Sequence, residues 1–144
     1  MQSCEWEKFE VRVLPVVGRS IFTKVRFKKG SIVCQYGGEL IGKRELKDRE
    51  KLYESDPSFY GSFVFEFWHG TQSLAIDATF DRSVGRLINH SIAKENIIPV
   101  KTKMNGVWGI SCVALRDIEI GEELFYKYGE GRDHVTDCLE WLKK

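Results

Sequence analysis

Short runs of β-favouring residues recur along the whole chain, and each run is closed by Gly, Asn, Asp or a Lys-Gly pair. Residues 9–14 alternate apolar and polar side chains, which is the pattern of a half-buried strand. Residues 31–36 end at a Gly-Gly pair, and residues 62–68 are rich in aromatic side chains. Because helical periodicity is scarce, the sequence predicts a mainly β domain.

The clearest local signal is Asn105-Gly106, which separates two β-prone stretches between Ile98 and Leu115. Both residues tolerate the positive φ that a type I′ turn requires, and this turn matches the twist of paired antiparallel strands. We therefore expect a β-hairpin here.

Two segments have helical character, residues 43–54 and residues 133–142. In the first, Glu45 precedes Arg49 by one helical turn, and the second opens at Asp133, a residue type that caps helix N-termini. Both segments are short, so we expect them at the periphery. We interpret the charges of the first segment as a solvated helix face rather than a binding patch.

The length of 144 residues accommodates one domain, because domains typically run from ~50 to 250 residues. We expect a single domain over residues 1–144 that includes a C-terminal helical segment at 133–144, and the initial Met with compact ends favours a whole small protein. Lys plus Arg number 22 and Asp plus Glu number 21. The resulting net charge of +1 predicts no general attraction to nucleic acid or to an anionic membrane.

The four cysteines lack the short spacing of a structural zinc site: Cys4, Cys34, Cys112 and Cys138. No metal is expected. Because no apolar signal stretch follows Met1, we expect a reducing compartment and four free thiols. The longest apolar run is too short to cross a bilayer, so the sequence predicts a soluble intracellular protein.

Familiar catalytic motifs such as GxGxxG, HExxH and GxSxG are missing. Two segments stand out because polar residues interrupt apolar sequence, GRLINHS at 85–91 and GEELFYKYG at 121–129. Taken singly, the tripeptide 89–91 is typical of a turn, and Tyr126 and Tyr128 are typical of one strand face.

Together and in this order, the two segments resemble the Arg-x-x-Asn-His-Ser and Gly-Glu-Glu-Leu-x-Tyr/Phe-x-Tyr stretches of the SET-domain protein lysine methyltransferases. The resemblance extends to residues 18–22, at the family's glycine-rich opening, to residues 27–41 and to the connector 116–121. It therefore covers nearly the whole chain. It implies a SET fold of several small curved sheets with a pseudoknot-like C-terminal crossing and short peripheral helices.

The resemblance also implies an enzyme that transfers a methyl group from S-adenosyl-L-methionine to a lysine amine and releases S-adenosyl-L-homocysteine. A lysine has a pKa of ~10.4 in solution, so its neutral, nucleophilic form costs ~4.6 kcal/mol at pH 7. A sulfonium beside it in a low-dielectric channel repels the ammonium and favours loss of the proton. No strong general base is then required, and none of the 3 histidines is assigned that role.

Within the family, residues 85–91, the two tyrosines and the Trp141 segment look most like the branch that monomethylates a lysine of the histone H4 tail. By this resemblance Tyr128 takes the catalytic place beside the transferred methyl, where its ring attracts a cation and its hydroxyl orients the amine. Tyr126 falls where the family carries Tyr or Phe, and a hydroxyl that crowds the amine there predicts monomethylation. Tyr36 matches a third tunnel tyrosine, with an ordinary strand aromatic as the equal alternative.

For the methyl donor, the resemblance assigns Gly18 and Arg19 to the methionine end, with Val17 contributing backbone. Asn89 and His90 are assigned to the amino and adenine portions. A satisfied buried histidine is the alternative for His90, but the flanking residues favour the donor site.

Two further aromatic residues are assigned to the donor by resemblance. Trp141 is expected to stack on adenine, with packing of a terminal helix as the alternative. Phe63 aligns with a donor-contacting aromatic, although a core strand position is the stronger interpretation.

The implied partner is a histone tail or a nucleosome, and a nuclear location follows from that substrate, with a cytoplasmic one otherwise. We expect a monomer without sequence-specific nucleic-acid binding and without membrane contact. Two departures leave other functions open: Ser20 stands where the family usually has glycine, and Lys127 replaces a commonly acidic residue between the tyrosines. The alternatives are a SET-like interaction module without turnover and a methyltransferase of a non-histone protein.

Overall fold

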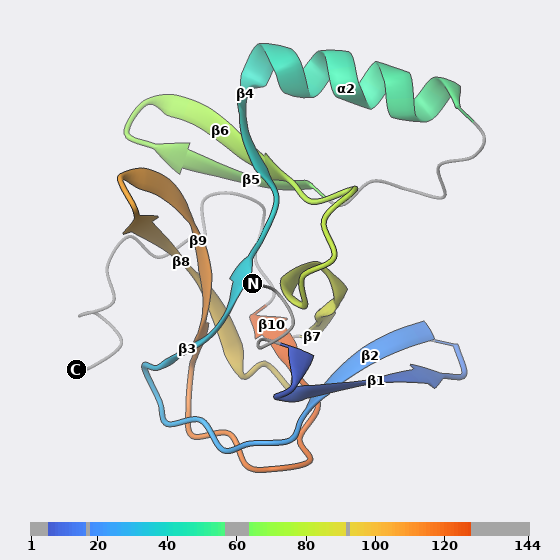
Figure 1. Cartoon of the computed structure of the whole chain (residues 1–144), viewed down its shortest axis with the longest axis vertical. Coiled ribbons are helices and arrows are strands. Elements are labelled where there is room, and N and C mark those ends of the chain that lie inside the picture. Colours follow the sequence, from blue (N-terminus) through green and yellow to red (C-terminus); the bar gives the residue numbers. More distant parts are fainter. Residues whose placement is uncertain (1–5, 17, 57–63, 92, 128–144) are drawn as a thin grey trace.

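The computed structural model describes residues 6–16, 18–56, 64–91 and 93–127. These residues form three small sheets, the α-helix α2 and the short 3₁₀ helix η1 (Figure 1). The sheets are strongly curled and join at their ends rather than stacking as flat layers (Figure 1). The prediction of a mainly β fold made of small curved sheets is confirmed.

The largest sheet has five strands in the order β3-β9-β8-β10-β7. Its members are β3 (Ile32–Tyr36), β9 (Val107–Ala114), β8 (Ile97–Met104), β10 (Phe125–Lys127) and β7 (Asn89–Ser91). Strands β8 and β9 form the predicted hairpin, in which Met104 is in register with Val107. Asn105 and Gly106 have φ of 52° and 80°, as a type I′ turn requires.

Strand β10 connects the two motif segments. It lies between β7 and β8 and pairs in parallel with both, so that Tyr126 is in register with His90 and with Ile97. Parallel strands cannot be joined by a tight turn, so the chain passes through β8 and β9 before it returns beside β7. This return is the C-terminal crossing that the resemblance implies.

A two-stranded ribbon, β1 (Phe9–Leu14) and β2 (Gly18–Thr23), packs next to this crossing. Its inner strand is bonded to the segment that leads into β10. The amide of Thr23 donates to the carbonyl of Glu122 at 3.0 Å, and the amide of Leu124 donates to the carbonyl of Ile21 at 2.8 Å. The ribbon and residues 122–124 are therefore held as one unit.

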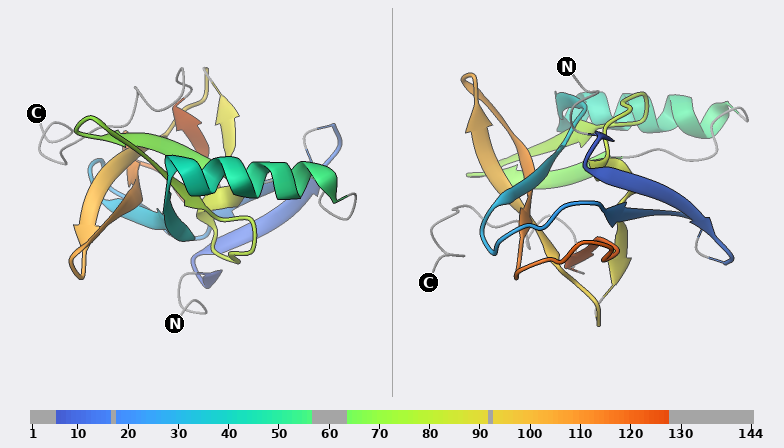
Figure 2. Two further views of the ribbon diagram at one scale, coloured as in Figure 1. Left: turned by 90° about the horizontal axis from the view of Figure 1, so that it is seen from above. Right: turned by 60° about the horizontal axis from the view of Figure 1, so that its bottom comes forward.

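The third sheet has the order β4-β6-β5, formed by β4 (Glu39–Gly42), β6 (Gln72–Asp77) and β5 (Val64–His69). Helix α2 (Lys43–Ser55) follows β4 directly and lies across this sheet (Figure 2), where it buries Leu46 and Tyr53. The helix predicted at 43–54 is thus confirmed. The strand predicted at 62–68 appears as β5, with residues 62–63 outside the described part, and the helix predicted at 133–142 lies wholly outside it.

Arg49 ties α2 to the sheet beneath it. Its guanidinium lies 2.9 Å from a carboxylate oxygen of Glu39, 2.7 Å from one of Glu45 and 3.1 Å from one of Asp77. The side chain of Asp77 is only 2% exposed, so this contact reaches into the interior. The interpretation of the helix charges as a solvated face is therefore wrong for Arg49, whose long side chain reaches the edge of the sheet.

The Asp77 carboxylate is surrounded by donors. It accepts hydrogen bonds from the hydroxyl of Tyr53 at 2.5 Å, from the hydroxyl of Thr79 at 2.6 Å and from the Thr79 amide at 3.0 Å. Burial raises the pKa of Asp77, but the hydrogen bonds from Thr79, Tyr53 and Arg49 outweigh it and hold this pKa below its ordinary value. Asp77 is thus charged at neutral pH and fixes α2, β6 and the following loop together.

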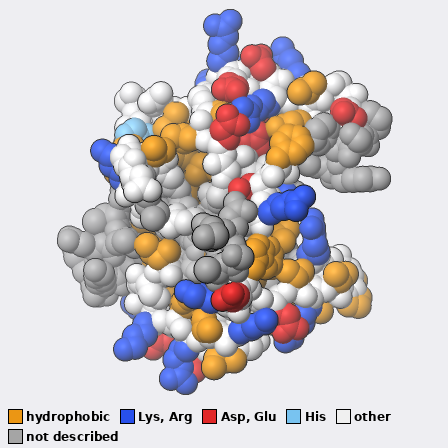
Figure 3. All heavy atoms as spheres, in the orientation of Figure 1, with side chains coloured by type: hydrophobic (Ala, Val, Ile, Leu, Met, Phe, Trp, Pro, Cys, Tyr) orange, Lys and Arg blue, Asp and Glu red, His pale blue; other side chains and the backbone are white. Residues whose placement is uncertain are grey.

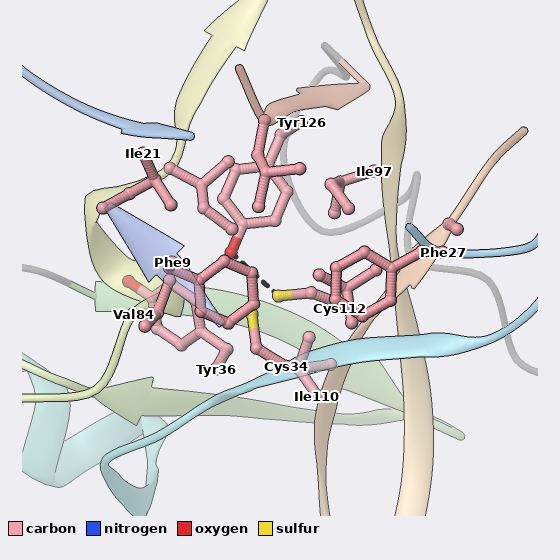
Figure 4. Close-up of a cluster of buried hydrophobic side chains, with 14 of the residues drawn as sticks. Phe9, Ile21, Phe27, Cys34, Tyr36, Val84, Ile97, Ile110, Cys112 and Tyr126 are labelled. Carbon is pink, nitrogen blue, oxygen red and sulfur yellow. Dashed lines mark hydrogen bonds between the residues drawn. The ribbon is translucent and has the colours of Figure 1, made fainter. Parts of the chain in front are cut away.

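The main core lies where the three sheets meet (Figure 4). Cys34 of β3 and Cys112 of β9 face each other across the strand pair in this core, and both are free thiols. The predicted free thiols are confirmed for these two residues, while Cys4 and Cys138 lie outside the described residues.

Helix η1 (Gly85–Leu87) packs directly against the end of β3. A Cβ atom on Gly85 would lie 2.7 Å from the carbonyl oxygen of Gln35 and 3.0 Å from the Cα of Tyr36. Only glycine permits this approach of two backbones. The first residue of the GRLINHS segment therefore sets the distance between that segment and Tyr36.

The surface carries charges of both signs side by side, with Lys and Arg next to Asp and Glu over α2 and over the opposite end of the molecule (Figure 3). This mixture agrees with the net charge of +1. Within the ranges that the structure describes, no helix has the length and apolar character needed to cross a membrane.

Replacing Gly85 with Ala is expected to destabilise the protein, because the added methyl group must push η1 away from β3. We expect a loss of about 1–3 kcal/mol in the free energy of unfolding, measured by urea denaturation. Gly109→Ala is the matched control, because a Cβ at Gly109 meets nothing within 4 Å. Equal stability of the two variants would contradict the close approach.

Replacing Asp77 with Asn is expected to change both stability and its dependence on pH. Because the folded pKa of Asp77 is lowered, its charge contributes stability that is present above the unfolded pKa and is lost as pH falls through the folded one. At pH 7 the variant should lose about 2 kcal/mol, the order expected for disrupted charge-assisted hydrogen bonds. Below about pH 4, where Asp titrates in the unfolded chain, the difference from wild type should shrink.

Asp48→Asn on the exposed side of α2 is the control for this measurement. It should stay within about 0.5 kcal/mol of wild type at pH 7, as exposed substitutions usually do. A difference between Asp77→Asn and wild type that is the same at pH 7 and pH 3 would refute the role of the charge.

Candidate active site

Tyr126 stands at the centre of β10, 3% exposed, and its ring enters the main core (Figure 4). Its hydroxyl donates to the carbonyl of Gly85 at 2.8 Å and lies 3.1 Å from the sulfur of Cys112. A carbonyl only accepts, so the single hydroxyl proton points to Gly85 and the thiol of Cys112 donates to the phenolic oxygen. Burial raises the pKa of Tyr126 well above its ordinary value, so this hydroxyl stays protonated.

His90 of β7 lies against Tyr126. The two ring centroids are 5.1 Å apart and the planes are tilted by 34°. Partial burial lowers the pKa of His90 below its ordinary 6.5, so the imidazole is neutral at pH 7. A neutral ring beside Tyr126 adds aromatic surface without adding a cation.

Asn89 precedes His90, and its carboxamide is held by three acceptors. The Nδ2 atom lies 3.2 Å from the carbonyl oxygen of Arg19, 3.1 Å from the Oγ of Ser20 and 3.3 Å from Oε2 of Glu123. We call these three acceptors the Asn89 clamp. Through it, the predicted donor residues Arg19 and Asn89, which are far apart in the sequence, are in direct contact.

Strand β2 begins at Gly18, directly before Arg19. Gly18 has φ of +79°, and a Cβ there would meet nothing within 4 Å, so the conformation and not the space requires glycine. Val16 in the same turn has φ of 75°, which is rare for a β-branched residue, and its side chain is fully exposed. Gly18 therefore begins β2 in a backbone conformation that favours glycine, and Gly18 and Arg19 are both paired with β1.

Tyr36 ends β3 and is buried in the same core cluster as Tyr126 (Figure 4). Its ring packs on Phe65 with centroids 5.2 Å apart and planes tilted by 54°. Burial raises the pKa of Tyr36 far above its ordinary value, so this phenol too is neutral. Two protonated tyrosines from β3 and β10 thus meet in one apolar region.

The described residues bring together six of the ten predicted site residues: Gly18, Arg19, Tyr36, Asn89, His90 and Tyr126. The other four lie outside the described residues: Val17, Phe63, Tyr128 and Trp141.

Asn96 supports the site and was missed by sequence reasoning. It is 1% exposed, its Nδ2 donates to the carbonyl of Glu123 at 2.8 Å, and its Oδ1 accepts from the amide of Phe125 at 2.8 Å. These bonds hold the backbone on both sides of Leu124, just before Tyr126. The available signal is an asparagine at the head of the apolar Ile-Ile-Pro-Val run, since a buried amide must find partners.

A pocket of about 420 Å³ lies next to the Asn89 clamp and shares Glu123 with it. It is lined by Ala93, Lys94, Asn96, Arg116, Glu122, Glu123 and Phe125. Of the predicted donor-binding residues that the structure describes, Gly18, Arg19, Asn89 and His90, none lines this pocket. Among the residues with described positions, no group of three His, Cys, Asp or Glu side chains is placed to bind a metal ion.

Comparison with known proteins gives a consistent result. A family model described as "SET domain" matches residues 18–129. The N-lysine methyltransferase KMT5A-A of Danio rerio is 36% identical over 137 residues, which is 92% of this chain and 38% of that protein. The histone-lysine N-methyltransferase set-1 of Caenorhabditis elegans is 40% identical over 128 residues, which is 88% of this chain and 52% of that protein. The chain thus spans between 38% and 52% of the length of these two relatives.

A solved structure shows the same likeness in three dimensions. The crystal structure of CpSET8 from Cryptosporidium superimposes with a TM-score of 0.76 at 31% identity. The match covers 85% of this chain and 58% of that chain.

Proposed function

The chain belongs to the SET-domain family, whose model matches residues 18–129, and on that premise we propose that it is an S-adenosyl-L-methionine-dependent protein-lysine N-methyltransferase. The proposal extends to a lysine of the histone H4 tail as substrate, to addition of a single methyl group, and to a nuclear monomer. The names of its relatives, N-lysine methyltransferase and histone-lysine N-methyltransferase, support this reaction and this substrate class.

One observation carries the proposal: the tyrosine segment and the Asn-His segment meet in adjacent strands. The parallel pairing of β10 with β7 puts Tyr126 against His90. The Asn89 clamp connects the same strand β7 to the Gly18 turn. The residues assigned to the two ends of the reaction are thereby neighbours.

The residues present fit a sulfonium donor. S-Adenosyl-L-methionine supplies a methyl group on a positively charged sulfur. Tyr126 and His90 offer neutral aromatic faces, which attract a cation without competing with it. A Cβ at Gly18 would meet nothing within 4 Å, so there is free space at this position beside Arg19 for part of such a molecule.

The surroundings of Tyr126 suit a neutral amine. An ammonium entering this apolar region loses hydration, which favours its deprotonated and nucleophilic form. The hydroxyl of Tyr126 donates its hydrogen bond to the carbonyl of Gly85, so its oxygen can act only as an acceptor toward the amine. In-line attack then depends on orientation, and Tyr128 is assigned to the transferred methyl.

Replacing Tyr126 with Phe is expected to shift the product from monomethyl-lysine to dimethyl-lysine. The hydroxyl is fixed by Gly85 and Cys112 and occupies space that a methylated amine must use to turn for a second attack. The product is read by intact-mass spectrometry of H4 after incubation with the donor. Tyr53→Phe is the control, because it also removes a buried hydroxyl but does so at Asp77, and it should leave the product monomethylated.

Activity itself is tested with nucleosomes, histone octamers and free H4 peptide, each incubated with wild type and with Tyr128→Phe. Wild type should transfer one methyl group per lysine in a donor-dependent reaction, and Tyr128→Phe should lose nearly all turnover while keeping its fold by circular dichroism. Transfer to no histone substrate by a folded wild type counts against the proposal.

Calorimetry with S-adenosyl-L-homocysteine distinguishes the two alternative functions, a SET-like interaction module without turnover and a methyltransferase of a non-histone protein. An interaction module without turnover should not bind it, whereas an enzyme for a non-histone protein should bind it and fail only with histones. An unbiased substrate screen then identifies the acceptor.

A further inference from the structure

We propose that Ser20 is a positioning residue, which fixes the Asn89 carboxamide so that its oxygen faces the methyl donor. The inference rests on the proposed function and deepens it. The family resemblance predicts glycine at position 20, and this chain has a serine there.

The chemistry of the neighbours determines which end of the Asn89 amide faces inward. The carbonyl of Arg19 and the carboxylate of Glu123 only accept hydrogen bonds, so the group that faces them must be the amine, Nδ2. The Oγ of Ser20, at 3.1 Å, is the nearest of the three acceptors. A flipped amide would bring its oxygen against the Arg19 carbonyl and the Glu123 carboxylate, neither of which can donate, so Nδ2 faces the clamp and Ser20 adds a third acceptor to it.

Ser20 is well placed to hold this orientation because its own position is fixed. It is 0% exposed, and its backbone is in register with Arg12 in the β1–β2 ribbon. Glu123 is held against the same ribbon through its bridge to Phe22. All three acceptors of the Asn89 clamp therefore belong to one hydrogen-bonded unit.

The opposite end of the amide remains available. Among the described residues, Oδ1 of Asn89 has no hydrogen-bond partner. A fixed carbonyl-type oxygen complements an ammonium group, such as the one on the methionine portion of the proposed donor. Ser20 thus acts through Asn89 and prepares an acceptor for that ammonium before the ligand arrives.

The test compares Ser20→Ala and Ser20→Cys with wild type. Alanine removes the acceptor, and cysteine keeps nearly the same volume but is a weak acceptor. Both should bind S-adenosyl-L-homocysteine about three- to ten-fold more weakly by calorimetry, the range expected for one lost hydrogen bond. The KM for the donor should rise by a similar factor while kcat changes little, because the lost interaction serves binding in the ground state and the transition state alike.

Ser111→Ala is the matched control. Ser111 is also 0% exposed and hydrogen-bonded through its hydroxyl, to Thr102 and Gln35. This variant should lower the melting temperature without changing the dissociation constant. If Ser20→Ala lowers only the melting temperature in the same way, or if Ser20→Cys binds like wild type, Ser20 serves packing and the inference is overturned.

Failure of this inference is distinguishable from failure of the proposed function. Wild type that binds no S-adenosyl-L-homocysteine refutes the function, whereas equal binding by wild type and Ser20→Ala refutes only the role of Ser20. If Ser20→Ala does not fold, solvent exchange of the Asn89 side-chain amide protons is compared by NMR between wild type and Ser20→Cys. Exchange that is faster in Ser20→Cys supports the role of Ser20, and equal exchange in both proteins overturns it.

Discussion

The parallel pairing of β10 with β7 and β8 is the interaction on which the rest of the site depends. Strand β10 has only three residues, too few backbone hydrogen bonds to hold it alone against the entropy of the chain. Its position is secured by the buried ring and hydroxyl of Tyr126 and by the side chain of Asn96. Fold stability and site geometry therefore come from the same contacts.

Hydrogen bonds of buried polar side chains fix the geometry around the site. Asn96 is bonded at both ends of its amide, and Asp77 receives donors from a helix and from a loop. Removing one hydrogen-bond partner from Asn96 or Asp77 would leave a buried polar atom without a partner. Because this loss costs free energy, other arrangements of the segments around these two residues are disfavoured. The close contact at Gly85 adds a steric limit to these electrostatic ones. These hydrogen bonds and the steric contact together restrict the position of the Tyr126 side chain.

The sequence predicted the features whose causes are local. The turn at Asn105-Gly106 and the helix after residue 42 follow from backbone preference and from spacing, and both are present. The contact of the two motif segments depends on the parallel pairing of two strands that lie far apart in the sequence. Local backbone preference does not encode such a pairing, so only the family resemblance could predict this contact. The inward reach of Arg49 and the role of Asn96 depend on partners from other strands and were missed.

Tyr126 and Asn89 present their side-chain oxygens to the site in the same way. The hydroxyl of Tyr126 donates a hydrogen bond to a backbone carbonyl, and the Nδ2 of Asn89 donates to the clamp, so each side chain presents an oxygen that can only accept. In the proposed reaction two cations approach each other here, and a carboxylate beside the lysine would stabilise its ammonium form and slow the reaction. Neutral oxygens orient a nitrogen without raising its pKa by much, because they carry dipoles rather than charges. The carboxylate of Glu123 contacts the Nδ2 end of Asn89, where it fixes the amide. Under the proposed function, these hydrogen bonds therefore fix the orientation of the site's oxygens before a ligand binds, which is the arrangement that preorganised electrostatic catalysis requires.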